Sequence, residues 1–92
     1  MHYLLIYETV PDYVARRAFR EKHLAHAQAA VQRGELVLGG AAGEPVDSAV
    51  ILFRASSPDV PASFAKADPY VINGLVKGWH VKPWDTVVGT LA

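Results

Sequence analysis

Apolar and polar residues are grouped into segments of two kinds along the chain. Four segments are short, rich in aliphatic, aromatic and β-branched side chains and poor in charge, as in a strand covered on at least one face. We therefore predict four strands, at residues 2–8, 35–40, 48–54 and 75–82. The second strand is expected to end in a Gly-rich loop over residues 39–45, and an extended segment over residues 84–90 is expected after Pro83.

The longest segment between these strands is predicted to be helical. Residues 13–33 contain neither Gly nor Pro and many alanines, which favours a helix of roughly five or six turns. Gly34 should end this helix, since glycine readily adopts a left-handed cap. We expect one stripe of the helix to pack against the sheet, formed by Tyr13, Leu24 and Val31 with Ala27 beside them.

A shorter helix is expected between the third and fourth strands. Ser57 and Pro58 form a helix-start signal, because serine caps helices and proline suits the first position. This helix should run to about Ala67, followed by a helical turn over residues 69–73 that Gly74 breaks. The order β-α-β-β-α-β is the ferredoxin-like α+β topology, with an antiparallel sheet and both helices on one face.

The second face of such a sheet needs another covering layer. A chain of 92 residues with 51% apolar side chains has enough for one domain, over residues 1–92, with a modest core. We expect a second copy of the chain to cover the open face, so the sequence predicts a homodimer that forms a dimeric α+β barrel. The aromatic residues that favour this pairing are Tyr3, Tyr7, Trp79 and Trp84.

Charge and cysteine content exclude some classes of function. Nine basic and nine acidic side chains cancel, which removes the positive surface expected of a protein that binds nucleic acid. Without cysteine there is no disulfide and no thiolate nucleophile, and a zinc site would need histidines and carboxylates. The first apolar run has no positive segment before it and is too short for a signal peptide or a membrane span, so we expect a cytoplasmic protein without membrane contact.

The candidate chemistry centres on Asp68 and His23. Asp68 precedes Pro69, which disfavours helical geometry at residue 68 and suits the first turn of a new helix. A carboxylate held in this way can accept from one ring nitrogen of a histidine, which fixes the tautomer and raises the basicity of the other nitrogen. His23 lies at the margin of the apolar stripe, where it can face a cleft between helix and sheet. The simpler interpretation of Asp68 is a plain helix cap.

Two other arrangements are less favoured. His26 is interpreted as a solvated or interface residue, although a metal site made of His23, His26 and Asp68 is an alternative, since residues three apart share a helix face. A Ser-His-Asp hydrolase is disfavoured because no serine lies in a nucleophile-elbow sequence. The chemistry that we expect requires no metal and no redox cofactor.

In order and approximate spacing, these residues resemble the YciI-like (YCII-related) family. The residues that carry the resemblance are Arg16 and Arg20 before His23-Leu24, the strand ending in Gly40, the run Asp68-Pro69-Tyr70-Val71, Gly74, and the run Val81-Lys82-Pro83-Trp84. The resemblance covers nearly the whole chain. Residues 41–44 depart from it, because a proline-containing and often longer loop is usual there.

The resemblance implies a ferredoxin-like domain that dimerises as a dimeric α+β barrel, with an active site centred on His23 and Asp68. The family includes a dehydrochlorinase that acts on a chlorinated hydroxyhydroquinone. The departure at residues 41–44 weakens any transfer of substrate, because we expect this loop to border the site.

Two functions of different classes are compatible with the sequence. In the first, His23 is a general acid or base, oriented by Asp68, in an elimination or isomerisation of a small hydroxylated aromatic or enolisable substrate. In the second, the protein is a non-catalytic module that binds a small molecule or a partner, and the same two residues are a satisfied structural pair. The residues expected to bind the substrate are Arg16, Arg20, Tyr70 and Tyr7; solvated arginines and core tyrosines are the alternative interpretation.

Overall fold

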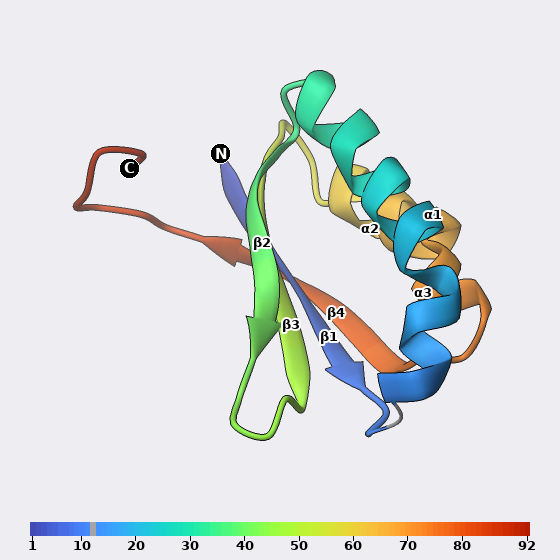
Figure 1. Cartoon of the computed structure of the whole chain (residues 1–92). Coiled ribbons are helices and arrows are strands. Elements are labelled where there is room, and N and C mark those ends of the chain that lie inside the picture. The colour runs from blue at the N-terminus through green and yellow to red at the C-terminus, as the bar shows by residue number, and fades with distance from the viewer. Residues whose placement is uncertain (12) are drawn as a thin grey trace.

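Four strands and three helices form the part of the chain that a computed structural model describes (Figure 1). This part comprises the backbone of residues 1–11 and 13–92 and the side chains of residues 1–11 and 18–92. None of its helices combines the length and the apolar composition needed to cross a bilayer. The elements are β1 (His2–Thr9), α1 (Tyr13–Gln32), β2 (Leu36–Ala42), β3 (Ser48–Arg54), α2 (Asp59–Ala67), α3 (Pro69–Ile72) and β4 (Val76–Trp84).

The strands form one antiparallel sheet in the order β2-β3-β1-β4. The central strand β1 pairs with β3 on one side, where Leu4 lies opposite Leu52, and with β4 on the other. All three helices lie on one side of this sheet, and the chain leaves the end of β4 on the other side (Figure 1). This is the predicted ferredoxin-like α+β fold.

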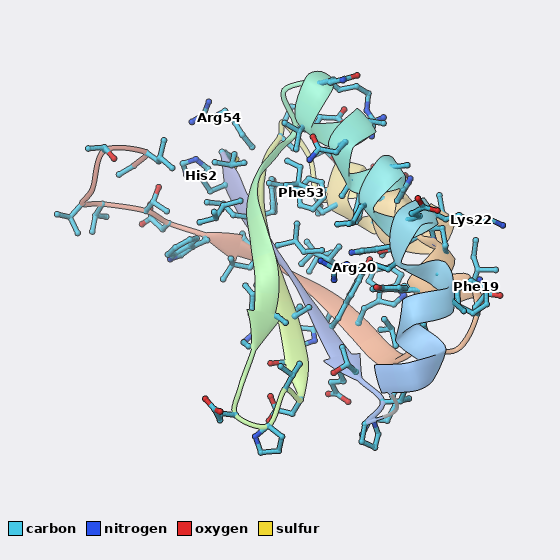
Figure 2. The ribbon with its side chains drawn as sticks, viewed as in Figure 1. His2, Phe19, Arg20, Lys22, Phe53 and Arg54 are labelled. Carbon is cyan, nitrogen blue, oxygen red and sulfur yellow. The ribbon has the colours of Figure 1, made fainter. Side chains whose placement is uncertain are left out.

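The core lies between the sheet and the helices. Side chains alternate along a strand, so Tyr3, Leu5 and Tyr7 all project from β1 toward the helices, where each is at least 95% buried. Phe53 of β3 is fully buried between the two layers (Figure 2) and meets the ring of Phe64 edge to face, with 5.2 Å between the centroids. The inward-facing apolar residues of the strands therefore form a single cluster under the helices. Tyr3, Tyr7 and Trp79, which were expected to favour pairing with a second copy, belong to this cluster or pack against it, and of the four aromatic residues Trp84 lines the opposite face.

The predicted packing stripe of α1 is wrong. Leu24 and Val31 are 42% and 43% exposed, whereas Ala30 is fully buried and Ala27 packs against the core. The side chain of Tyr13 lies outside the described residues. Small side chains allow α1 to approach the sheet closely, so the alanines face inward although the longer aliphatic residues are more hydrophobic. The predicted end of the helix is confirmed, since Gly34 adopts a φ of 78°.

The predicted Gly-rich loop is shorter than expected, because β2 continues through Gly39 and Gly40 to Ala42. The two glycines lie opposite Ile51 and Val50 of β3. A Cβ atom at residue 39 would lie 3.3 Å from Cγ2 of Ile51, so the absence of a side chain accommodates a close neighbour. Pairing with β3 thus outweighs the weak strand propensity of glycine.

Strand β4 is also longer than predicted. It extends to Trp84, which lies opposite His2 of β1, and it includes Pro83. Because β4 is at the edge of the sheet, a residue without an N–H group can be accommodated there. The remaining segment, residues 85–92, is called the tail below.

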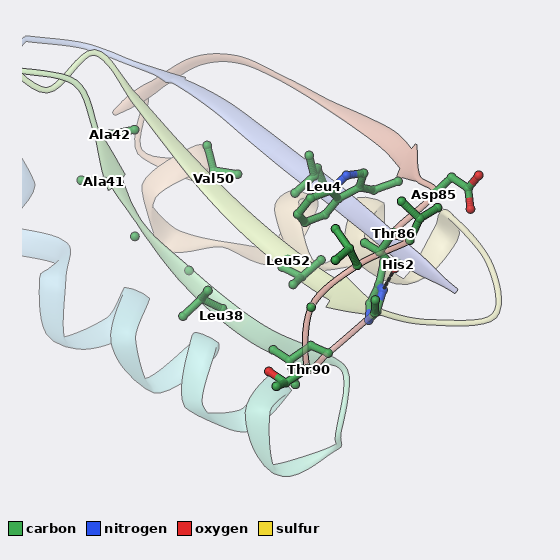
Figure 3. Close-up of a pocket in the computed structure, with 18 residues that line it drawn as sticks. His2, Leu4, Leu38, Ala41, Ala42, Val50, Leu52, Asp85, Thr86 and Thr90 are labelled. Atoms are coloured by element: carbon green, nitrogen blue, oxygen red, sulfur yellow. Dashed lines mark hydrogen bonds between the residues drawn. The ribbon is translucent and has the colours of Figure 1, made fainter.

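The sheet face away from the helices, called the open face below, carries Leu4, Leu38, Val50 and Leu52. Together with the tail, these residues line a cavity of about 820 Å³ (Figure 3). The tail is attached at its start, because Oγ1 of Thr86 lies 2.8 Å from Nδ1 of His2. The open face is therefore apolar and only partly covered by the chain itself.

Truncation of Phe53 tests this description of the core. Phe53→Ala removes buried contacts and leaves a cavity, so we expect the free energy of unfolding to fall by about 3 to 5 kcal/mol in urea denaturation. Ile72→Ala is the control, because Ile72 is 66% exposed on α3 and its truncation should change the free energy by less than about 0.5 kcal/mol. Similar losses in the two variants would contradict the assignment of the core.

Candidate active site

Asp68 occupies the junction between α2 and α3. Its backbone is extended, with φ of −70° and ψ of 124°, so that it ends the first helix and caps the second. Pro69 is the first residue of α3, and the backbone N–H of Tyr70 donates to Oδ1 of Asp68 over 3.0 Å. The helix cap predicted from the Asp-Pro sequence is confirmed, and it fixes the direction of the carboxylate.

The Asp68 carboxylate accepts two further hydrogen bonds from side chains that are distant in sequence. Tyr7 donates its hydroxyl to Oδ2 over 2.7 Å. Nδ1 of His23 lies 2.9 Å from Oδ1 and 3.0 Å from Oδ2. The side chain of Asp68 is fully buried, so these contacts replace the water that a carboxylate would otherwise bind.

Burial by itself would raise the pKa of the Asp68 carboxyl. The hydrogen bonds from His23, Tyr7 and the Tyr70 amide, together with positive charge on His23, more than offset burial and lower this pKa below its usual value. Asp68 is therefore ionised at neutral pH. An ionised carboxylate has no proton to donate, so the proton of its contact with His23 is on Nδ1.

His23 is held on one edge and on one face of its ring. Nδ1 is occupied by Asp68, and the ring of Tyr70 stacks on the imidazole with 4.0 Å between the centroids and 6° between the planes. Nε2 makes no hydrogen bond with a described residue, and 18% of the side chain is exposed. The arrangement gives an oriented imidazole whose second nitrogen can exchange a proton with another molecule.

The residues predicted to bind substrate lie in different environments. Tyr7 is 1% exposed and Tyr70 is 6% exposed, and both contact the His23–Asp68 pair. Arg20 is exposed one helical turn before His23, and Figure 2 shows its side chain directed from α1 toward the sheet. The side chain of Arg16 lies outside the described residues. The substrate-binding roles of all four residues stay predictions.

The hydrogen bond from Tyr7 to Asp68 was not predicted from the sequence. The available signal was the alternation of β1, because Tyr7 is two residues after Leu5 and so faces the helices with it. The partner of the Tyr7 hydroxyl depends on how α2 and α3 pack on the sheet. A local sequence pattern does not predict that packing.

The interpretation of His26 as a solvated residue is wrong, whereas a position at an interface between copies stays a prediction. His26 is half-buried, its Nε2 lies 2.9 Å from the carbonyl oxygen of Phe64, and its ring stacks on that of Phe64 at 4.3 Å. A carbonyl accepts, so Nε2 is the donor. His26 thus connects α1 with α2. Within residues 1–11 and 18–92, no three His, Asp or Glu side chains are grouped as metal ligands would be.

Comparisons with known proteins agree with this fold. A family model described as the YCII-related domain matches residues 1–85, which confirms the resemblance found in the sequence. The chain is similar to a solved structure of the 5-chloro-2-hydroxyhydroquinone dehydrochlorinase (TftG) from Burkholderia phenoliruptrix AC1100, in complex with 2,5-dihydroxybenzoquinone. The sequences are 23% identical, the match covers 92% of this chain and 94% of that chain, and the TM-score is 0.76.

A second similar structure is that of protein Atu4242 from Agrobacterium tumefaciens. It is 22% identical in sequence, the match covers 89% of each chain, and the TM-score is 0.52. No curated protein matches the chain significantly. At these identities the structural similarities show a shared fold.

The lowered pKa of Asp68 predicts how stability depends on pH. An unfolded aspartate titrates near pH 3.9, so the ionised carboxylate stabilises the folded state above about pH 4, and this contribution is lost as the pH falls through the lower folded value. The Asp68→Asn variant has no carboxyl group at this position, so it lacks this pH-dependent contribution to stability. The difference in free energy of unfolding between the wild type and Asp68→Asn should therefore be present above about pH 4 and shrink below it.

Urea denaturation from about pH 7 to about pH 3 measures this difference. Asp85→Asn, in the exposed tail, is the control and should leave the free energy within about 0.5 kcal/mol of the wild type throughout. A difference for Asp68→Asn that does not vary with pH would show that the buried carboxyl is not ionised in the folded protein.

Proposed function

Because the chain belongs to the YCII-related family and carries an imidazole against a buried carboxylate, we propose that it is an enzyme whose catalytic residues are His23 and Asp68. His23 is the general base or acid, and Asp68 orients it. The reaction is an elimination or isomerisation of a small hydroxylated aromatic or enolisable substrate, and it requires no metal or redox cofactor.

The observation that best supports this proposal is the difference in solvent exposure between His23 and Asp68. The Asp68 side chain has no exposed surface, whereas that of His23 is 18% exposed. A buried anion that accepts Nδ1–H stabilises the imidazolium formed when Nε2 takes a proton. The pair is therefore suited to proton transfer with a molecule that approaches from outside.

In an elimination of this kind, Nε2 of His23 removes a proton from the substrate. The electron pair of the broken bond forms a new double bond, and the leaving group departs with its own electron pair, as chloride does in a dehydrochlorination. The imidazolium then returns its proton to water. A positioned imidazole typically contributes about 10²- to 10⁴-fold to such a step.

Arg20 is proposed to bind the substrate. It is one turn before His23 on the same face of α1, and its charge would attract an anionic oxygen of a hydroxylated ring. The structural neighbour from Burkholderia phenoliruptrix is named for its action on 5-chloro-2-hydroxyhydroquinone, which supports the choice of substrate class for this chain. Arg16 is proposed for the same role from the family resemblance.

A second copy of the chain is proposed to cover the open face. Leu38 is 65% exposed there, and the tail residues Val87 and Val88 are 83% and 87% exposed. The cavity of about 820 Å³ between the tail and the sheet is lined mainly by apolar side chains. Two sheets that pack face to face are about 10 Å apart, so a second sheet would remove these side chains from water.

The enzyme proposal is tested with 5-chloro-2-hydroxyhydroquinone as the probe and chloride release as the measurement. The wild type should release chloride, and His23→Gln should lower kcat/KM by about 10²- to 10⁴-fold while the protein stays folded. His80→Gln is the matched control, because His80 is exposed on β4 and its loss should leave turnover unchanged. Full turnover in His23→Gln would refute the proposed base. Binding of the probe by the wild type without turnover would favour the non-catalytic module.

The homodimer is tested by placing a charge on the open face. Leu38→Glu should convert the dimer to a folded monomer, because a carboxylate in an apolar interface lacks a partner. Ile72→Glu is the control, since Ile72 is 66% exposed on the helical side and the chain should stay dimeric. Sedimentation velocity gives the mass of each variant. A monomeric wild type, or a dimer in both variants, would contradict this interface.

A further inference from the structure

Tyr7 connects the central strand of the sheet to the candidate site. It lies opposite Ala49 of β3 and Trp79 of β4, so its backbone is fixed by neighbours on both sides. Its side chain is 99% buried, and its hydroxyl donates to Oδ2 of Asp68 over 2.7 Å. The other two donors to Asp68 come from α1 and α3, so Tyr7 provides the contact between the carboxylate and the sheet.

We propose that Tyr7 is a positioning residue, whose hydroxyl holds the Asp68 carboxylate in place and reduces the negative charge that His23 experiences. This inference rests on the proposed function, since it assigns the regulation of His23 basicity to a residue that does not contact the substrate. It replaces the substrate-binding role predicted for Tyr7 from the sequence.

The geometry supports a positioning role over substrate binding. Tyr7 is 1% exposed, and its hydroxyl already donates to a charged acceptor at short distance. Burial, followed by the charge of Asp68 and the hydrogen bond to it, raises the pKa of the Tyr7 phenol far above its usual range. The phenol therefore remains protonated and remains a donor wherever the protein is folded.

The Tyr7 hydroxyl also reduces the negative charge of the Asp68 carboxylate that acts on His23. A carboxylate that shares its negative charge among three donors stabilises a neighbouring imidazolium less than one that has two donors. Removing the Tyr7 hydroxyl should therefore leave Asp68 a stronger partner for protonated His23. The His23 ring should then hold its proton to higher pH.

Other charged or titratable groups on the surrounding elements also act on His23. They are equally present with and without the Tyr7 hydroxyl, so their contribution cancels when two variants are compared. Among the described side chains, Arg20 and His26 lie one helical turn from His23 on α1, and the phenol of Tyr70 on α3 stacks on it. Lys66 on α2 and Lys77 on β4 are further charged groups on the surrounding elements. The side chains of Arg16 and Arg17 lie outside the described residues.

Tyr3 offers a matched control. It projects from the same face of β1 and is 5% exposed, but its hydroxyl is directed to the sulfur of Met1, at 3.8 Å, and not to Asp68. Tyr3→Phe and Tyr7→Phe thus each remove one phenolic hydroxyl from β1. Only Tyr7→Phe removes a hydrogen-bond donor from the Asp68 carboxylate.

The test is an NMR titration of the histidine ring protons between about pH 4 and pH 9 in the wild type and the two variants, with the His23 signal assigned from His23→Gln. Tyr7→Phe should move the His23 midpoint upward by on the order of half a pH unit to one unit. The midpoints of His2, His26 and His80 should stay the same, as should that of His23 in Tyr3→Phe. An unchanged His23 midpoint in folded Tyr7→Phe would overturn the inference.

A second variant keeps the test decisive if Tyr7→Phe does not fold. Incorporating 3-fluorotyrosine at position 7 retains the ring and strengthens the donor, so the His23 midpoint should move to lower pH. An upward shift or no shift would overturn the inference. Because the titration requires no turnover, failure of chloride release would count against the proposed function and leave the result for Tyr7 intact.

Discussion

The interaction on which the structure most depends is the burial of the ionised carboxylate of Asp68. A carboxylate without exposed surface is stable only if donors replace its water, and here the donors come from β1, α1 and α3. These bonds connect the sheet, the long helix and the junction between the two short helices at one point. Replacing a buried ionic pair by apolar residues is often neutral or stabilising, so stability alone does not account for this arrangement.

Much of the fold follows from local patterns in the sequence. The apolar segments gave the strands, and Asp-Pro gave the cap that orients the carboxylate, because these features depend on neighbouring residues only. The sequence pattern did not predict which face of α1 packs against the sheet. Ala30 is a core residue and Leu24 is not, because the helix approaches the sheet closely. The strand that continues through Gly40 likewise depends on its partner β3.

The candidate site was predictable only where it depends on local sequence. The Asp-Pro sequence and the position of His23 on its helix marked the two residues as a candidate pair, and the family resemblance implied the same pair, although 45 residues separate them in sequence. The structure brings them into contact. The hydrogen bond from Tyr7 spans 61 residues and joins a strand to a helix junction, so it arises only from tertiary packing. The contact of His26 with the carbonyl of Phe64, which joins α1 to α2, was missed on the same grounds.

The alternation of side chains along β1 has a consequence for substitutions and insertions in this strand. Tyr3, Leu5 and Tyr7 face the helices and the candidate site, whereas Leu4 faces the opposite side. Odd-numbered positions of β1 therefore face the core and the candidate site, and even-numbered positions lie on the open face. Substitutions can alter one of these faces and leave the other unaltered, as long as the strand keeps its register. A single-residue insertion in β1 would exchange the two sets of side chains and disrupt both faces at once.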